Sequence, residues 1–174
     1  MYQRLALSPE EDELSSGPCT NPVGMVSCSS KNCRNFESCP NPVTRYLRSK
    51  SLTHNLVPRE SRIGWGLNSN VDIDCGEIIT EYIGEFSSEA RDLKYSFKIT
   101  DTLFLSALVK GNSARFINHA CKPNSRAELW SVDGFMRVFI FAERLIPKST
   151  FITLKYGNEY CFQGGCQCDS CYSK

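Results

Sequence analysis

The amino-acid sequence predicts a mainly β domain of small curled sheets, with short helices and a zinc-bound cysteine segment at each end. Many short apolar runs are separated by Gly, Pro and Asn, a pattern typical of short strands and tight turns. Long runs with the 3.6-residue period of a helix are scarce. Eight of the ten cysteines in the 174 residues fall into an early and a late set of four. Together these features favour one folded domain flanked by metal-bound segments.

The composition argues against several classes of protein. The hydrophobic content of 41% is ordinary for a soluble globular domain, and no window has the apolar length of a membrane span. A secretory signal pattern is not seen at the N-terminus. The formal net charge of +1 argues against nucleic-acid binding through bulk charge. We expect a monomer that makes no membrane contact. A set of local basic residues could touch DNA weakly, although a solvated face is the simpler interpretation: Arg45, Arg48, Lys50, Arg59 and Arg62.

The early cysteine set predicts one zinc ion. Cys19, Cys28, Cys33 and Cys39 lie in a segment rich in Asn, Ser and Pro that has little apolar material for a core. Four thiolates around one zinc would order such a segment, because the free energy of metal binding becomes free energy of folding. Two disulfides are the alternative, and the missing secretory signal disfavours them. The preceding residues 1–18, with four acidic residues at 10–13, are expected to be a mobile acidic tail.

The part of the chain that follows predicts short strands. Two glycines surround Trp65 in residues 63–67. They predict a bulge or tight turn, because glycine accepts positive φ. Residues 78–85 predict a strand with a closing turn, and residues 87–94 predict a short helix.

Three further strands or hairpins are predicted downstream. Residues 95–99 and 103–105 are separated by a short turn and predict a hairpin. Asp133-Gly134, between apolar runs at 127–130 and 136–141, is the strongest short hairpin signal in the sequence. Residues 151–154 predict a buried strand.

The segment 115–124 is the centre of the functional prediction. Asn118 and His119 lie between an apolar step and Cys121, and Pro123 ends the segment in a rigid turn. Three more thiols follow far downstream, at Cys166, Cys168 and Cys171. Structural zinc favours four ligands, so Cys121 is the candidate fourth. Zinc would then hold the C-terminal tail against the Asn-His pair and form a pocket. The alternative is that Asn118 and His119 only satisfy a buried turn.

Four blocks of the sequence resemble the SET-domain family of lysine methyltransferases, and they occur along the chain in the order that the family has. The family reads Arg-Phe-x-Asn-His-Ser-Cys-x-Pro-Asn where this chain has 115–124, with Ala120 in place of the serine. Residues 63–67 match an upstream Gly-Trp-Gly block, and 153–157 match a downstream tyrosine block. The tail at 166–171 resembles the post-SET element. The early cysteines resemble the second half of the AWS module that precedes some SET domains.

The resemblance implies a SET-type fold, with S-adenosylmethionine as cofactor and two structural zinc ions. The implied parts are a mobile tail, an AWS-like zinc segment, the SET domain and a post-SET zinc segment: 1–18, 19–50, 51–160 and 161–174. The residues implied to bind the cofactor are Gly64, Trp65, Gly66, Tyr95, Arg115, Asn118, His119 and Gln167. Tyr156 matches the family's catalytic tyrosine, and Tyr82 would line the channel for the lysine.

The function implied by the resemblance is that of a nuclear, chromatin-associated enzyme that methylates a lysine of a histone tail or nucleosome. Residues 130–134 resemble the Trp-x-Val-x-Gly of the AWS-bearing branch, so the lysine at position 36 of histone H3 is the favoured target. The lysine at position 9 is the alternative. Ser106, Ala120 and Lys155 depart from the family pattern and keep open a catalytically silent SET module that serves chromatin interactions. Leu154 replaces an aromatic residue, so the number of methyl groups transferred is left unpredicted.

Overall fold

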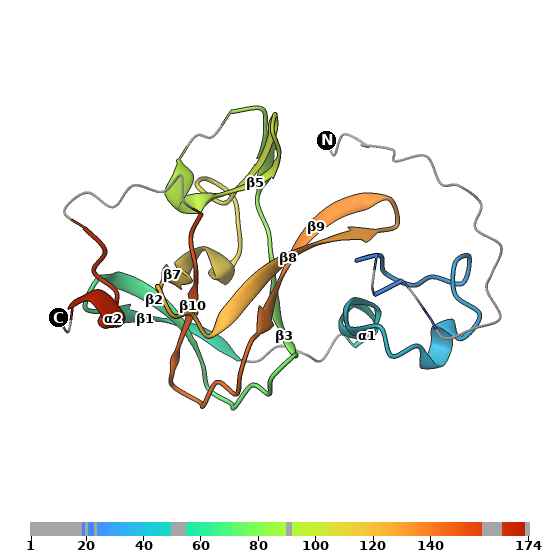
Figure 1. Ribbon diagram of the computed structural model, residues 1–174, viewed down its shortest axis with the longest axis horizontal. Helices are drawn as coiled ribbons and strands as arrows, with labels where there is room; N and C mark the ends of the chain where they lie inside the picture. Colours follow the sequence, from blue (N-terminus) through green and yellow to red (C-terminus); the bar gives the residue numbers. More distant parts are fainter. Residues whose placement is uncertain are drawn as a thin grey trace.

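The computed structural model describes residues 19, 21–22, 24–49, 55–89, 92–157 and 165–172. In these residues the chain forms ten strands arranged in three small sheets, with only short helices between them (Figure 1). This architecture confirms the mainly β prediction. The acidic tail predicted at 1–18 lies outside the described residues.

The first sheet joins both ends of the SET-like region. Its strand order is β1-β2-β10-β7, where the strands are Leu56–Ser61, Gly64–Ser69, Phe151–Leu154 and Asn118–His119. β1 and β2 form a hairpin, and Gly64 has a φ of +100° at its turn. Only glycine adopts that conformation without strain, which explains the turn predicted around Trp65. β7 runs parallel to β10, and this pairing brings two segments that are distant in sequence side by side.

The second sheet contains the hairpin with the strongest sequence signal. Its order is β3-β9-β8, with strands Ile78–Tyr82, Phe135–Ala142 and Ser125–Val132. Asp133 and Gly134 form the turn between β8 and β9, with φ values of 50° and 79°. Positive φ at both positions is the backbone that a two-residue Asp-Gly hairpin turn requires. The predicted hairpin is therefore confirmed.

The third sheet corrects one prediction. Its order is β4-β6-β5, with strands Glu85–Ser87, Leu103–Ser106 and Ser96–Thr100. The sequence predicted a helix over 87–94, but Ser87 pairs with Phe104 as the last residue of β4. A short 3-10 helix, η2, occupies Leu93–Tyr95 instead. Pairing with the apolar β6 outweighs a weak helical preference in this segment. Residues 90–91 lie outside the described part.

The other helices are short: η1 (Phe36–Ser38), α1 (Pro42–Arg48), η3 (Ser113–Phe116) and α2 (Asp169–Tyr172). α1 begins where Asn41 accepts a hydrogen bond from the Thr44 N–H at 3.0 Å, with Pro42 in the first turn. The Asn41 amide also donates to the Val26 carbonyl at 2.9 Å, so the start of α1 is bound to the early cysteine segment.

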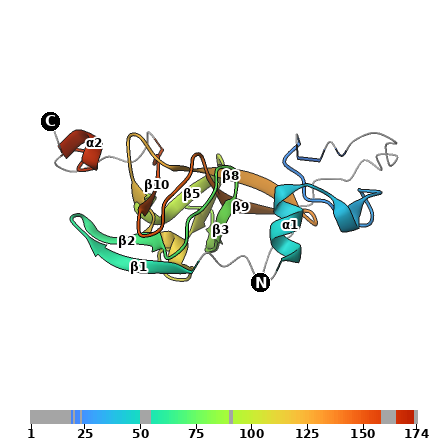
Figure 2. The same ribbon diagram turned by 90° about the horizontal axis from the view of Figure 1, so that it is seen from below.

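Two apolar clusters form the core. The larger fills the space between the sheets with fully buried side chains such as Leu67, Ile140 and Ile152. The smaller packs Val43 of α1 against Phe139 of β9. The smaller cluster places α1 and the early cysteines at one end of the molecule. α2 lies at the other end, beside the β1-β2 hairpin (Figures 1 and 2). No helix in the described ranges has the length and apolar character needed to cross a membrane.

Candidate active site and cysteine clusters

The pairing of β7 with β10 builds the centre of the site. Asn118 lies opposite Thr153 and His119 opposite Leu154, and the Ala120 N–H donates to the Leu154 carbonyl at 2.8 Å. The Asn-His pair of the sequence motif is therefore held against the strand that leads into Tyr156. Asn118 and His119 thus form a strand paired with β10 and do more than satisfy a buried turn.

Tyr156 is held at both its main chain and its hydroxyl. Its N–H donates to Nδ1 of His119 at 3.0 Å, and its O–H donates to the Ile117 carbonyl at 2.7 Å. The His119 and Tyr156 rings meet edge to face, with centroids 5.5 Å apart. Burial, and then the positive charge of Lys155, lowers the pKa of His119. A neutral imidazole is the form that can accept the Tyr156 hydrogen bond.

A second group of predicted residues gathers on β2 and β7. The Asn118 side-chain amide donates to the Trp65 carbonyl at 2.9 Å. Gly66 admits no side chain, because a Cβ there would lie 2.7 Å from the Phe151 ring. Trp65 is 60% exposed, so the contact between β2 and β7 carries an exposed aromatic residue next to Asn118. Gly64 is exposed at the hairpin turn next to them.

A cavity of about 340 Å³ is lined by Tyr82, Arg115 and Tyr156, and Tyr156 connects it to His119 of β7. Tyr82 is only 5% exposed, and its O–H donates to the Tyr95 carbonyl at 2.9 Å. Burial raises the pKa of the Tyr82 phenol, which therefore stays neutral at physiological pH. Phe97 packs edge-on against Tyr82, with ring centroids 4.6 Å apart. Part of the cavity wall is therefore aromatic and uncharged.

The mouth of the cavity is cationic. The described residues that line it include Lys94, Lys98, Arg115 and Lys155 and no carboxylate. Lys98 forms an ion pair with Asp101 at 3.2 Å, outside the lining. Lys155 is exposed and Leu154 is buried, so the departure Leu-Lys-Tyr places an aliphatic wall inside and a cation at the rim. Arg115 donates to the Leu108 carbonyl at 2.8 Å, with its guanidinium 5.1 Å from the Tyr95 ring centre.

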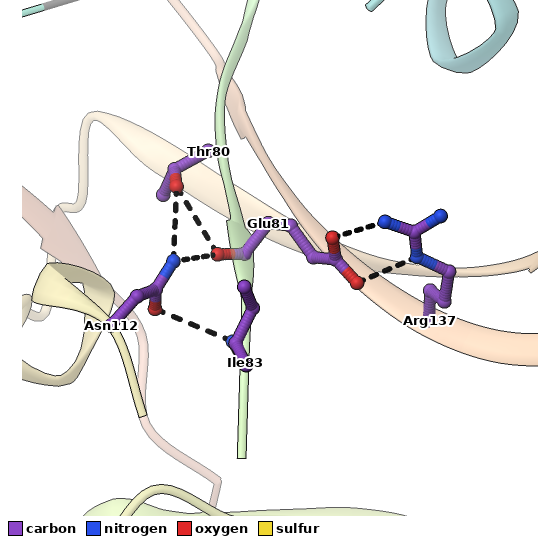
Figure 3. Close-up of polar contacts among 5 residues, drawn as sticks. All are labelled: Thr80, Glu81, Ile83, Asn112 and Arg137. Carbon is purple, nitrogen blue, oxygen red and sulfur yellow. Dashed lines mark hydrogen bonds and ion pairs between the residues drawn. The ribbon is translucent and has the colours of Figure 1, made fainter. Parts of the chain in front are cut away.

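Asn112 supports the cavity, although nothing in the sequence singled it out. Figure 3 shows its amide against the end of β3, where it donates to the Glu81 carbonyl at 2.8 Å and accepts from the Ile83 N–H at 3.4 Å. The side chain thereby replaces a neighbouring strand on both sides of Tyr82. On the other side of β3 the Glu81 carboxylate binds Arg137 of β9, with one N–O distance of 2.6 Å (Figure 3).

Replacing Asn112 by alanine is expected to lower the free energy of unfolding by about 1 kcal/mol, because the half-buried Glu81 carbonyl loses its partner and the exposed Ile83 N–H can turn to water. Urea denaturation monitored by tryptophan fluorescence would measure the change. Asn70→Ala is the control, since Asn70 is exposed and accepts one bond from Arg59 at 3.3 Å. Equal stability of the two variants would show that the contacts with β3 contribute nothing.

The early cysteine cluster is compact. The sulfur atoms of Cys19, Cys28, Cys33 and Cys39 all lie within 4.8 Å of one another. Cys28 is 3.3 Å from both Cys19 and Cys39. Tetrahedral zinc with Zn–S bonds near 2.3 Å requires sulfur separations of about 3.8 Å, which small side-chain movements would reach. The predicted set of four therefore fits one metal ion.

The late cysteine cluster brings Cys121 to the C-terminal tail. The four sulfur atoms again lie within 4.8 Å of one another: Cys121, Cys166, Cys168 and Cys171. Cys121 is 3.7 Å from Cys166 and 3.5 Å from Cys171. The separations are close to those of a tetrahedral zinc site, so the predicted joining of Cys121 to the tail has the required geometry. Gln167 is exposed between two of these cysteines.

The comparisons with known proteins agree with this geometry. A model of the SET domain matches residues 64–157. Histone-lysine N-methyltransferase SETD2 of Homo sapiens is 30% identical over 170 residues, covering 86% of this chain and 6% of the relative. Putative histone-lysine N-methyltransferase ASHH4 of Arabidopsis thaliana is 33% identical over 164 residues, covering 87% and 46%. A Candida albicans enzyme named histone-lysine N-methyltransferase, H3 lysine-36 specific, is 32% identical over 185 residues, covering 99% and 20%. The chain spans less than half the length of each of these relatives.

Proposed function

The chain belongs to the SET-domain family, and we propose that it transfers a methyl group from S-adenosylmethionine to a lysine of a histone tail. One observation carries the proposal most strongly. Tyr156 lines the cavity, and its main-chain N–H binds His119. The residue next to His119 is Asn118, which binds Trp65, so Tyr156 links the cavity to the face formed by Trp65 and Asn118. A methyl acceptor on one side of Tyr156 and a methyl donor on the other would meet at this residue.

The residues around Trp65 fit the proposed cofactor. An exposed indole can stack on a planar or cationic group, and the Asn118 amide lies within hydrogen-bonding distance of the main chain of Trp65. Gly64, Gly66, Asn118 and His119 would bind the cofactor's polar ends, with Gln167 facing the adenine. S-adenosylmethionine, when bound, supplies an electrophilic methyl group on a sulfonium. Arg115 lines the cavity with its guanidinium over the Tyr95 ring, and both residues would also contact the cofactor.

The cavity walls suit a neutral lysine amine. A free lysine amine has a pKa near ~10.4 and is almost fully protonated at physiological pH. Tyr82, Phe97 and Leu154 provide a dry surface, and the cations at the mouth disfavour another positive charge. Both effects lower the pKa of a lysine that enters. The Tyr156 hydroxyl would then hold the amine in line for transfer, and a fixed orientation supplies much of the acceleration.

We also propose that each cysteine cluster holds one structural zinc ion. The early cluster would order the AWS-like segment and the late cluster would hold the tail against the site. Elemental analysis of the purified chain should give two zinc ions, and a mass consistent with disulfides would contradict this assignment. The relatives named as histone methyltransferases favour a nuclear, chromatin-bound protein that acts on histones or nucleosomes. We further propose that it acts as a monomer, with weak DNA contact at most.

The proposed target is the lysine at position 36 of histone H3. The Candida albicans relative carries that specificity in its name, and residues 130–134 match the corresponding branch. The test compares nucleosomes that carry normal H3, H3 with arginine at position 36, and H3 with arginine at position 9. We expect labelled methyl transfer to disappear only with the substitution at position 36. Loss only at position 9 would support the alternative target. Cofactor binding by calorimetry without transfer to any histone would favour the silent interaction module.

A further inference from the structure

The tip of the β1-β2 hairpin is bound to the C-terminal segment 165–172 through one side chain. Arg62 lies in the turn between the two strands, two residues before Gly64. Its guanidinium stacks 3.9 Å from the centre of the Tyr172 ring, and one of its nitrogens lies 3.5 Å from the Asp169 carboxylate. The same nitrogen donates to the main-chain carbonyl of Gln167. Three different groups of the segment thus converge on Arg62.

These contacts fix the segment in a way that the cysteine cluster alone does not. The cysteine cluster brings the segment to Cys121 through sulfur atoms alone. Arg62 holds it from the side of β1 and β2, which also carry Trp65 and Gly66. A planar guanidinium that makes a stacking contact, an ion pair and a hydrogen bond defines an orientation as well as a distance. The Gln167 main chain, between two cluster cysteines, is one of the bonded groups.

We propose that Arg62 is a positioning residue that orients the cysteine-bearing C-terminal segment over the Trp65–Asn118 face and so sets the affinity for the methyl donor. This inference rests on the proposed function, because it assumes that the donor binds at that face. The sequence placed Arg62 only among basic residues expected on a solvated face or at a weak DNA contact. Its side chain is 38% exposed, so its three contacts are accessible to solvent and individually modest. Exposed contacts of these kinds each change an equilibrium by about two- to fivefold, and together by about tenfold.

The test compares Arg62→Ala and Tyr172→Ala with Arg59→Ala as a matched control. Arg59 lies in β1 but binds Asn68 and Asn70 of the hairpin instead of the C-terminal segment. We expect Arg62→Ala to raise the Kd and KM for S-adenosylmethionine about tenfold, with kcat at saturating cofactor changed less than about twofold. Tyr172→Ala should give a smaller change in the same direction. Arg62→Lys should recover part of the affinity, because an ammonium keeps the positive charge and can still approach the Tyr172 ring, but it loses the planar stacking and the paired N–H donors of the guanidinium. Zinc content should stay the same in all variants.

A fall in kcat at unchanged KM would overturn the inference, and so would equal effects of Arg59→Ala and Arg62→Ala. Amide hydrogen exchange of residues 165–172 keeps the test independent of catalysis. We expect faster exchange there in Arg62→Ala and not in Arg59→Ala. Unchanged exchange would overturn the role of Arg62 whether or not the chain is an enzyme. If residues 165–172 exchange faster in Arg62→Ala but the normal chain binds no S-adenosylmethionine, the proposed function is refuted, and the effect on affinity with it.

Discussion

Replacing Tyr156 by phenylalanine is expected to lower the rate of methyl transfer about 10²–10³-fold while cofactor binding is retained. The substitution removes one hydroxyl from the reacting centre and keeps the ring. The hydrogen bond from the Tyr156 main chain to His119 at 3.0 Å does not involve the hydroxyl, so β7 stays bound to the residues that follow β10. The lost bond to the Ile117 carbonyl at 2.7 Å should lower the free energy of unfolding by about 1 kcal/mol, which leaves the chain folded.

Tyr46→Phe is the matched control for this variant. Tyr46 packs edge-on against Phe139, with centroids 5.8 Å apart, at the α1 end of the molecule. Its hydroxyl is expected to have no influence on the rate. Calorimetry for cofactor affinity and single-turnover kinetics with labelled cofactor would separate binding from chemistry. A Tyr156→Phe variant that transfers methyl groups at the normal rate would remove Tyr156 from the proposed reaction.

Replacing Cys121 by serine is expected to lower the zinc content from two ions to one and to weaken cofactor binding by more than about tenfold. Cys121 is the only described member of its cluster outside the segment 165–172, so its loss removes the sulfur-cluster link between that segment and the SET-like body and leaves the contacts of Arg62. The segment carries Gln167 and the partners of Arg62, and its release should open the Trp65 face. The effect should therefore exceed that of Arg62→Ala.

Cys75→Ser controls for the general effect of removing a thiol. Cys75 is exposed, and its sulfur lies 3.3 Å from the Glu143 carbonyl, outside both cysteine clusters. Zinc content and cofactor affinity should both be normal in this variant. Elemental analysis and calorimetry measure the two quantities on the same samples. A Cys121→Ser chain that loses zinc with unchanged cofactor affinity would separate zinc binding from cofactor binding. It would contradict the proposal that the segment 165–172 covers the cofactor site.

Local signals made much of the fold predictable. The β8-β9 hairpin followed from Asp133-Gly134, because those residues accept the positive φ that the turn requires. The parallel pairing of β7 with β10 could not be predicted in the same way. β7 has two residues, too few for any periodicity, and its partner lies more than 30 positions away. The helix expected at 87–94 was wrong because β6 pairs with Ser87, a contact that local propensity does not contain.

The site residues likewise divide into those that a local sequence signal predicts and those whose partners are distant in the chain. Cysteine spacing predicted both clusters because thiol chemistry leaves few uses for four close cysteines, and the structure brings each set together. Asn112 and Arg62 were missed because their partners are distant in the chain. The Asn112 amide binds Glu81, 31 positions away, and Arg62 binds Gln167, 105 positions away. An isolated Asn or Arg carries no sequence signal of such a partner.

The most direct measurement is transfer of labelled methyl from S-adenosylmethionine to recombinant nucleosomes by the normal chain and by Tyr156→Phe side by side. The proposed function, with the acceptor lysine in the cavity that Tyr156 lines, predicts label on histone H3 with the normal chain. The Tyr156→Phe variant should give a rate about 10²–10³-fold lower at equal cofactor occupancy. A normal chain that holds its zinc, binds S-adenosylmethionine and places no label on any histone would contradict the proposed methyltransferase.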